Sequence, residues 1–418
     1  MTCEAQAIAT PSDKAVRQAS AAHPPRLSRP LTLLFSLTCA LAVANVYFVQ
    51  PLLDSIAHSL HVAPRLIGIA VTATQIGYAL GLVFIVPLGD LINRKGLMIT
   101  QTLLSALALT AVGFATHWSM LLGAMVMVGL MAVLVQVIVA YAAALASPQQ
   151  RGQAVGTVTS GVVLGILLAR FTSGLIADLA GWRAVYFVSA GLMLALAMVL
   201  ARTVPSTRQP RFNHSYPALL WSMLTLFATE RTLRIRGVLA LLIFAAFSVL
   251  WTAMVLPLSA PPLSLSHTQI GLFGLAGLAG ALAASKAGRW ADRGLGRRTT
   301  GVALTLLTLS WLPTAFTQTS LMALVVGVIV LDFAVQAVHV TSQSLIFAAH
   351  PDAQSRLVGA YMCFYSIGSA LGAAAATQVY AQWGWGAVCL LGALISASAL
   401  AYWAWTDFIP APDSGSRP

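Results

Sequence analysis

The chain has 418 residues, of which 58% are hydrophobic and only 8% are charged. Soluble proteins carry about 25% charged residues, so this composition excludes an ordinary soluble protein and predicts an integral membrane protein. The net charge of +12 does not indicate nucleic-acid binding, because the basic residues lie in short loops between apolar segments.

The first 30 residues are polar, with no apolar run, so residues 1–30 are predicted to be a cytoplasmic tail rather than a signal peptide. The four cysteines, Cys3, Cys39, Cys363 and Cys389, show neither a disulfide framework nor a metal-ligand spacing. We therefore expect no metal and no cofactor.

Apolar runs predict twelve membrane-spanning helices, because about 20 mostly apolar residues cross the ~30 Å hydrocarbon core. The first six spans are 31–51, 66–88, 97–115, 120–146, 154–176 and 184–203. The second six are 237–258, 268–287, 300–316, 321–347, 357–378 and 385–405. Their length and number predict an all-α integral membrane bundle.

A long hydrophilic connection, residues 204–236, divides the chain into a six-helix half at 31–203 and another at 237–405, before a tail at 406–418. Within it, the apolar stripe between Pro217 and Arg231 predicts a helix on the inner membrane surface. With the N-terminus inside, 20 of the 23 Lys and Arg residues lie on the inner side and two, Arg65 and Arg183, outside. This split predicts that both termini are cytoplasmic.

Acidic and basic residues recur in the loops after the second and eighth spans. The residues are Asp90, Arg94 and Lys95 in the first loop, and Asp292, Arg293, Arg297 and Arg298 in the second. With twelve spans and a central loop, this pattern resembles the major facilitator superfamily of transporters, whose loop reads Gly-x-x-x-Asp-Arg-x-Gly-Arg-Arg/Lys. The second copy keeps most of it, with one extra residue, whereas the first keeps the acid and the basic pair.

The resemblance implies two parallel six-helix halves, alternating access and a monomer. It also implies that these loops latch the inner faces of the halves together, through Asp90, Arg94, Lys95, Asp292, Arg293 and Arg297. The alternative is that the basic residues only set the orientation in the membrane.

The fifth span also resembles drug-exporting members of the superfamily, which carry Gly-x-x-x-Gly-Pro-x-x-Gly-Gly there. Gly161 and Gly165 keep the glycine spacing, which permits close helix packing. Ile166, Ala169 and Arg170 stand where those members have proline and two glycines.

The tenth span carries a polar stripe in an otherwise apolar helix. Asp332, Gln336, His339 and Gln343 fall at i, i+4, i+7 and i+11, and therefore on one helix face. Lipid does not solvate such groups, so the stripe predicts a polar cavity inside the bundle. Asp332 is the one mid-span acid and must be neutralised by a proton or a cation. The alternative is a static polar network that holds helices together.

Arg170 is the one cation well inside a predicted span. It could counter the charge of Asp332, hold an anionic substrate, or extend outward toward Asp178. Other polar residues near the middle of their spans, Asn45, Gln75 and Gln136, are further candidates for the cavity lining.

These observations predict a secondary transporter that exports small hydrophobic compounds in exchange for protons. The alternatives are a proton-coupled uptake symporter for a small metabolite, a polytopic membrane enzyme, and a non-transporting sensor. No phosphate-cradling loop is present, which argues against ATP as the energy source. We expect a small-molecule substrate, protons and the lipid bilayer as partners, and the bacterial inner membrane as the location.

Overall fold

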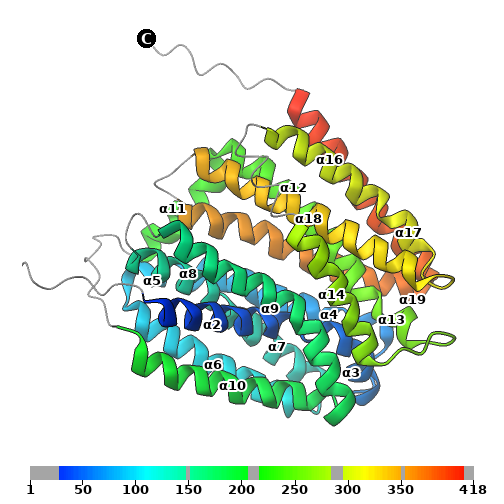
Figure 1. Cartoon of the computed structure of the whole chain (residues 1–418), viewed down its shortest axis with the longest axis horizontal. Coiled ribbons are helices and arrows are strands. Elements are labelled where there is room, and N and C mark those ends of the chain that lie inside the picture. Colours follow the sequence, from blue (N-terminus) through cyan, green and yellow to red (C-terminus); the bar gives the residue numbers. More distant parts are fainter. Residues whose placement is uncertain (1–27, 147–150, 206–215, 284–294, 350–353, 409–418) are drawn as a thin grey trace, which may run out of the picture.

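The structure is a computed structural model that describes residues 28–146, 151–205, 216–283, 295–349 and 354–408. All regular structure in these residues is helical. The long helices run side by side and form one bundle (Figure 1). We call the end of the bundle that holds the turns near residues 61, 116 and 262 the outer end, following the predicted orientation.

The first half contains the six helical spans that the sequence predicts there. Their elements are α2 (Arg29–Tyr47), η1 (Gln50–Leu52), α3 (Leu53–Ser59), η2 (Pro64–Leu66), α4 (Ile69–Phe84), α5 (Leu88–Leu91), α6 (Arg94–Gly113), α7 (Trp118–Ala132), α8 (Leu134–Leu145), α9 (Arg151–Ala180) and α10 (Trp182–Thr203). The first, second and fourth spans each consist of more than one element. The third, fifth and sixth are single helices.

The second half follows a short connecting helix, α11 (Tyr216–Thr229). Its elements are α12 (Arg231–Ala253), α13 (Val255–Ser259), α14 (His267–Ala283), α16 (Gly296–Leu309), α17 (Trp311–Ala315), α18 (Leu321–Ala349) and α19 (Gln354–Phe408). The last of these holds two spans, because Gly384 has a φ of 73° and interrupts the helix. Glycine adopts this left-handed conformation without the steric cost that a Cβ atom brings.

Nine helices of the described residues are long and apolar enough to cross a membrane. One of the nine, Leu357–Thr406, contains both the eleventh and the twelfth predicted span. The eighth and ninth predicted spans are occupied by α14 and by α16 with α17, which are shorter in the described residues. Within the described residues, each predicted span is therefore occupied mainly by helix.

Small residues bring the helices of the first half close together. A methyl group added at Gly161 or Gly165 of α9 would lie 2.2 Å from a backbone oxygen of α2. The α4–α7 pair is equally tight, because a methyl group at Gly129 would lie 1.8 Å from the Thr74 oxygen. Membrane helices gain no hydrophobic drive from lipid, so such backbone approach carries much of their packing energy.

The substitution Gly129→Ala is expected to destabilise the protein. Overpacking costs about 1–3 kcal/mol, which exceeds the roughly 0.5–1 kcal/mol that alanine gains over glycine in a helix. Thermal unfolding of the purified protein in detergent measures the effect as a lower midpoint. Gly123→Ala on the same helix α7 is the matched control, since its methyl group meets nothing within 4 Å. Equal midpoints for the two variants would contradict the tight α4–α7 packing.

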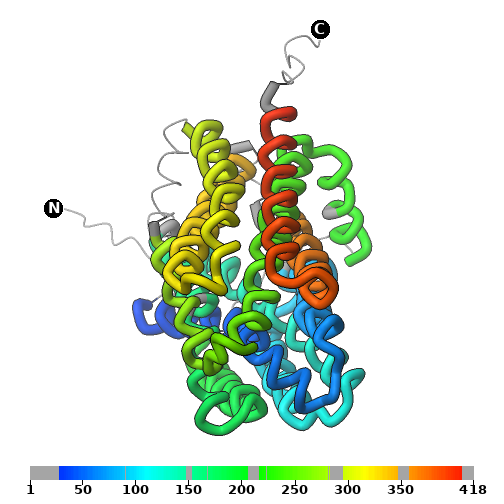
Figure 2. Tube along the Cα trace, turned by 90° about the vertical axis from the view of Figure 1, so that its right-hand side faces the viewer, coloured from blue at the N-terminus to red at the C-terminus, as the bar shows by residue number. Residues whose placement is uncertain are grey.

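The two halves meet along two helix pairs, α9 with α14 and α4 with α19. Near the outer end, the helices of each pair approach so closely that glycines of one helix lie against backbone atoms of the other. A methyl group at Gly174 would lie 2.3 Å from the His267 oxygen, and one at Gly68 would lie 2.4 Å from the Ala373 oxygen. Figure 2 looks onto this end of the bundle and shows elements of the two halves side by side. In this conformation the outer end is closed.

The connecting helix α11 contacts both halves near the opposite end. The Tyr216 hydroxyl donates to the Phe84 oxygen of α4 at 2.8 Å. The Phe227 ring packs 5.6 Å from the ring of Phe364 in α19. Trp221 on the same helix is 69% exposed. A helix with one packed and one exposed apolar face fits the predicted position at the membrane surface.

Candidate functional site

A cavity of about 170 Å³ lies between the two halves of the bundle. Its polar lining residues are Tyr47, Gln75, Tyr78, Gln136, Thr159, Gln336, His339, Gln343 and Tyr365. Its apolar lining residues are Val43, Val46, Val135, Val162, Val163, Ile166, Phe244, Phe247, Val340 and Met362. Among these described residues there is no Asp, Glu, Lys or Arg. His339 is therefore the one described lining residue that can carry a charge near neutral pH.

The polar stripe of α18 divides between the cavity and a buried position beside it. Gln336, His339 and Gln343 line the cavity, whereas Asp332 lies one turn farther toward the outer end. Asp332 is 3% exposed and is not among the lining residues. Of the other candidates, Gln75 and Gln136 line the cavity, and Gln136 Nε2 donates to the Tyr78 hydroxyl at 3.4 Å.

Asn45 lies outside the lining. Ser189 Oγ donates to its Oδ1 at 2.5 Å, so Asn45 joins α2 to α10 within the first half. A mid-span amide on α2 is thus used in helix packing. Its position in the sequence does not show whether it lines the cavity or joins two helices.

Aromatic side chains close the cavity toward the outer end. The hydroxyls of Tyr47 and Tyr365, which come from opposite halves, form a hydrogen bond. The Phe244 ring packs against Tyr365 with ring centroids 4.2 Å apart, and His339 also packs against Phe244, at 5.2 Å. Reopening the cavity toward the outer end therefore requires the Tyr47–Tyr365 bond to break.

Beyond this aromatic layer, Trp251 of α12 connects a buried acid to a buried base. Its Nε1–H donates to Asp332 Oδ1 at 3.1 Å. The guanidinium carbon of Arg170, from the other half, lies 3.7 Å from the indole ring centroid. Both residues belong to the described part of the chain, yet they form no direct ion pair. Desolvated cation–π contacts contribute about 2 kcal/mol or more, less than the several kcal/mol that burying each charge costs.

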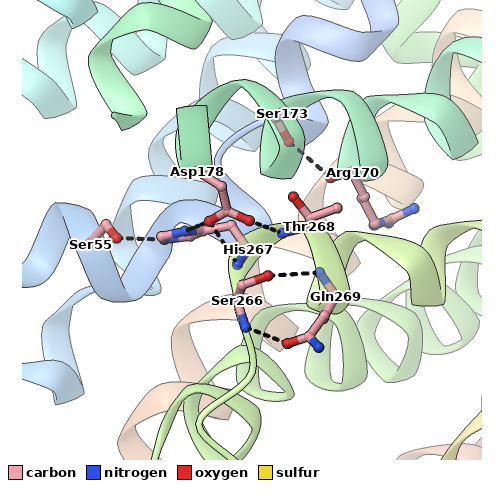
Figure 3. A network of polar contacts seen from close by, with 8 residues as sticks. All are labelled: Ser55, Arg170, Ser173, Asp178, Ser266, His267, Thr268 and Gln269. Atoms are coloured by element: carbon pink, nitrogen blue, oxygen red, sulfur yellow. Dashed lines mark hydrogen bonds and ion pairs between the residues drawn. The ribbon is translucent and has the colours of Figure 1, made fainter. Parts of the chain in front are cut away.

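Arg170 is 1% exposed and extends into the interior. Its Nε donates to Gln50 Oε1 at 2.8 Å. Figure 3 shows its side chain directed away from Asp178. The side chain therefore does not extend toward Asp178, one of the three alternatives drawn from the sequence. Compensation of Asp332 and binding of an anionic substrate stay predictions.

Asp178 instead holds the outer ends of the two halves together (Figure 3). Its carboxylate accepts from the backbone N–H groups of His267 and Thr268, at 3.2 and 2.8 Å, and is 2.6 Å from His267 Nδ1. Ser55 Oγ is 2.6 Å from the other ring nitrogen of His267. A carboxylate of α9 thus caps the first turn of α14, where the helix dipole favours a negative charge. Sequence reasoning missed this contact, since nothing in the sequence pairs residues 89 positions apart.

The predicted latch is described only in part. Arg94 Nε donates to the Gly89 oxygen at 2.9 Å, and its Nη1 lies 3.5 Å from the Ala140 oxygen of α8. Lys95 is half-buried and Arg297 is exposed. Asp292, Arg293 and the side chain of Asp90 lie outside the described residues. A link between the two loops therefore stays a prediction.

Comparisons with known proteins agree on the class of this molecule. A sequence model of the Major Facilitator Superfamily matches residues 35–255 and 237–418. The chain is 45% identical over 382 residues to "Uncharacterized transporter YgaY" of Escherichia coli O157:H7, covering 91% of this chain and 96% of that protein. It is 30% identical over 380 residues to "Probable transporter SCO4007" of Streptomyces coelicolor, covering 90% and 87%.

The fold is also that of a solved transporter. A bacterial homologue of the human lysosomal transporter Spinster, crystallised in an inward-facing and occupied conformation, matches with a TM-score of 0.74 at 16% identity. The match covers 91% of this chain and 98% of that one. The molecule is therefore a multi-pass membrane transporter. It belongs to the Major Facilitator Superfamily, and its all-helical, two-half fold is confirmed.

Proposed function

We propose that the protein exports small, uncharged, hydrophobic compounds in exchange for protons, by alternating access between its two halves. It works as a monomer in the bacterial inner membrane, with both termini in the cytoplasm. One observation carries this proposal: an aromatic and amide-lined cavity lies beside a buried carboxylate that is not part of its lining. Substrate and proton then have neighbouring but separate sites.

The lining selects for uncharged compounds. A charged substrate would lose its hydration and find no opposite charge among the described lining residues, which is costly in a buried site. A compound with an apolar body fits Phe244, Phe247 and Val340, and one or two polar atoms can bond to Gln75 or Gln136. The glutamine side chains both donate and accept, so they do not restrict the compound to one polar group.

The surroundings of Asp332 fit a proton site. With the outer end closed, Arg170 stands on the far side of the Trp251 ring and compensates the carboxylate. Arg170 belongs to the other half, so opening the outer end withdraws this cation. A carboxylate left without a cation in a low-dielectric site takes up a proton. Closing the outer end returns Arg170, and the proton leaves through the cavity toward the cytoplasm.

A proteoliposome assay with a pH-sensitive dye inside tests this function. A panel of uncharged hydrophobic compounds is added outside, with charged analogues of the same size as the comparison. Exchange predicts that entry of an uncharged compound drives protons out and raises the internal pH. A fall in internal pH would instead identify an uptake symporter. Signals equal to those of protein-free liposomes for every compound would contradict the proposed coupling.

A further inference from the structure

One tryptophan connects the charges of the two halves. Arg170 comes from α9 in the first half, whereas Trp251 and Asp332 come from α12 and α18 in the second. The centroid of the indole ring lies 3.7 Å from the guanidinium carbon, and the indole N–H donates to the carboxylate at 3.1 Å. Trp251 is not a cavity-lining residue. Its contacts are therefore not explained by substrate binding.

Arg170 has few other links to the second half. Its hydrogen bonds go to Gln50 at 2.8 Å and to the Ile166 oxygen at 3.4 Å, both in the first half. Its Nη2 has no hydrogen-bond partner within the described structure. The Phe247 ring lies at 5.6 Å, farther than that of Trp251. The contact with Trp251 is thus the main short-range attraction that Arg170 makes across the interface.

The indole and the carboxylate are enclosed by α14. A methyl group added at Gly277 would lie 2.1 Å from Asp332 Oδ2 and 3.2 Å from Trp251 Cζ2. Only a glycine permits this approach, and the close packing keeps the indole N–H directed at the carboxylate.

We propose that Trp251 locks the empty transporter with its outer end closed, by transmitting the charge of Asp332 to Arg170. This inference rests on the proposed function. An ionised carboxylate polarises the indole N–H, makes the ring more negative and strengthens its hold on the guanidinium. A proton on Asp332 removes that charge, so Arg170 loses the polarised ring and the attraction of the carboxylate together.

Substrate reaches the same lock from the cavity. Tyr47 and Phe247 line the cavity and also face the Arg170 guanidinium, at 5.1 and 5.6 Å from their ring centroids. A compound that displaces either ring disturbs the position of Arg170. The lock therefore opens for a proton or for a substrate, but not for the empty carrier. Exchange needs this behaviour, whereas a symporter has to return empty.

The titratable groups around the lock are few. Asp332, Tyr47 and Tyr365 act electrostatically on Arg170, and Arg170 acts on Asp332. His339 lies two turns along α18 and faces the cavity. Tyrosine titrates only near pH 10, so Asp332 is the one of these three groups that can take up a proton when the pH falls from about 8 to about 5.

Spin-label distance measurements test the lock without any substrate. The full-length protein, with its four cysteines replaced by alanine, carries labels at Ser119→Cys and Thr319→Cys. These exposed positions lie at the outer ends of opposite halves. In lipid nanodiscs at about pH 8 we expect one short distance, and at about pH 5 a second, longer distance. Trp251→Phe, which keeps an aromatic ring but lacks the donor, is expected to show the longer distance at both pH values.

Trp311→Phe is the matched control. This buried indole also donates through its Nε1, to Ser396 at 3.0 Å, but both partners lie in the second half. It is expected to behave as the wild type. A Trp251→Phe variant with wild-type distances at both pH values would overturn the proposal. So would a wild type whose distances do not change with pH, and that result would leave the proteoliposome test of transport unaffected.

The double variant with Asp332→Asn should open no further than either single variant, since additive opening would mean that the residues act independently.

Discussion

Asp332→Asn is expected to abolish substrate-driven proton movement in proteoliposomes while leaving compound binding in place. Asparagine has nearly the same shape and still accepts from Trp251 Nε1–H, but it does not titrate. Asp332 is outside the cavity lining, so the variant should bind an uncharged compound within a few-fold of wild type. The internal dye is expected to report the signal of protein-free liposomes, although downhill flux of the compound continues.

Asp54→Asn provides the matched control for the chemical change. Asp54 lies on α3, is partly exposed and is 3.6 Å from His58 on the same helix. It should retain the wild-type proton signal. If Asp332→Asn moves protons as the wild type does, Asp332 is a structural residue and another group carries the proton. If it loses compound binding and proton movement together, the two sites are not separate.

The number and places of the helices followed from the sequence because lipid imposes a simple constraint. Each backbone group in the membrane must bond within its own segment, so every long apolar run had to be a helix. Where the runs were interrupted, the prediction was less complete. The single residue Gly384, with its positive φ, separates the last two spans, and the first span is made of α2, η1 and α3 in succession. Such breaks depend on local backbone geometry, which an apolar run does not encode.

Helical periodicity predicted only the part of the site that lies on one face of α18. A spacing of three and four residues puts side chains on one face, and Gln336, His339 and Gln343 do line the cavity together. Periodicity says nothing about how deep the cavity extends along the helix, and Asp332 lies beyond it. The contacts of Trp251 with Arg170 and of Asp178 with His267 depend on how two halves dock, which no pattern within one helix records.

Cross-linking the outer ends of the two halves is expected to stop transport completely. Ser55 and His267 lie on opposite halves, with side-chain atoms 2.6 Å apart, and alternating access requires them to separate. A cleavable bifunctional thiol reagent applied to the Ser55→Cys/His267→Cys protein on a cysteine-free background should form the link in this conformation. Compound flux is then expected to fall to the level of protein-free liposomes and to return when the reagent is cleaved.

The control pair has the same kind of contact within one half. Arg183 donates to Ser59 Oγ at 3.0 Å, and both residues belong to the first half. A link between Ser59→Cys and Arg183→Cys should leave the flux unchanged, because a rigid-body rearrangement does not alter distances within a half. Flux that persists across the Ser55–His267 link would mean that the outer end does not open there. The Asp178–His267 contact would then be a fixed hinge, and the opening would have to occur along the α4–α19 pair instead.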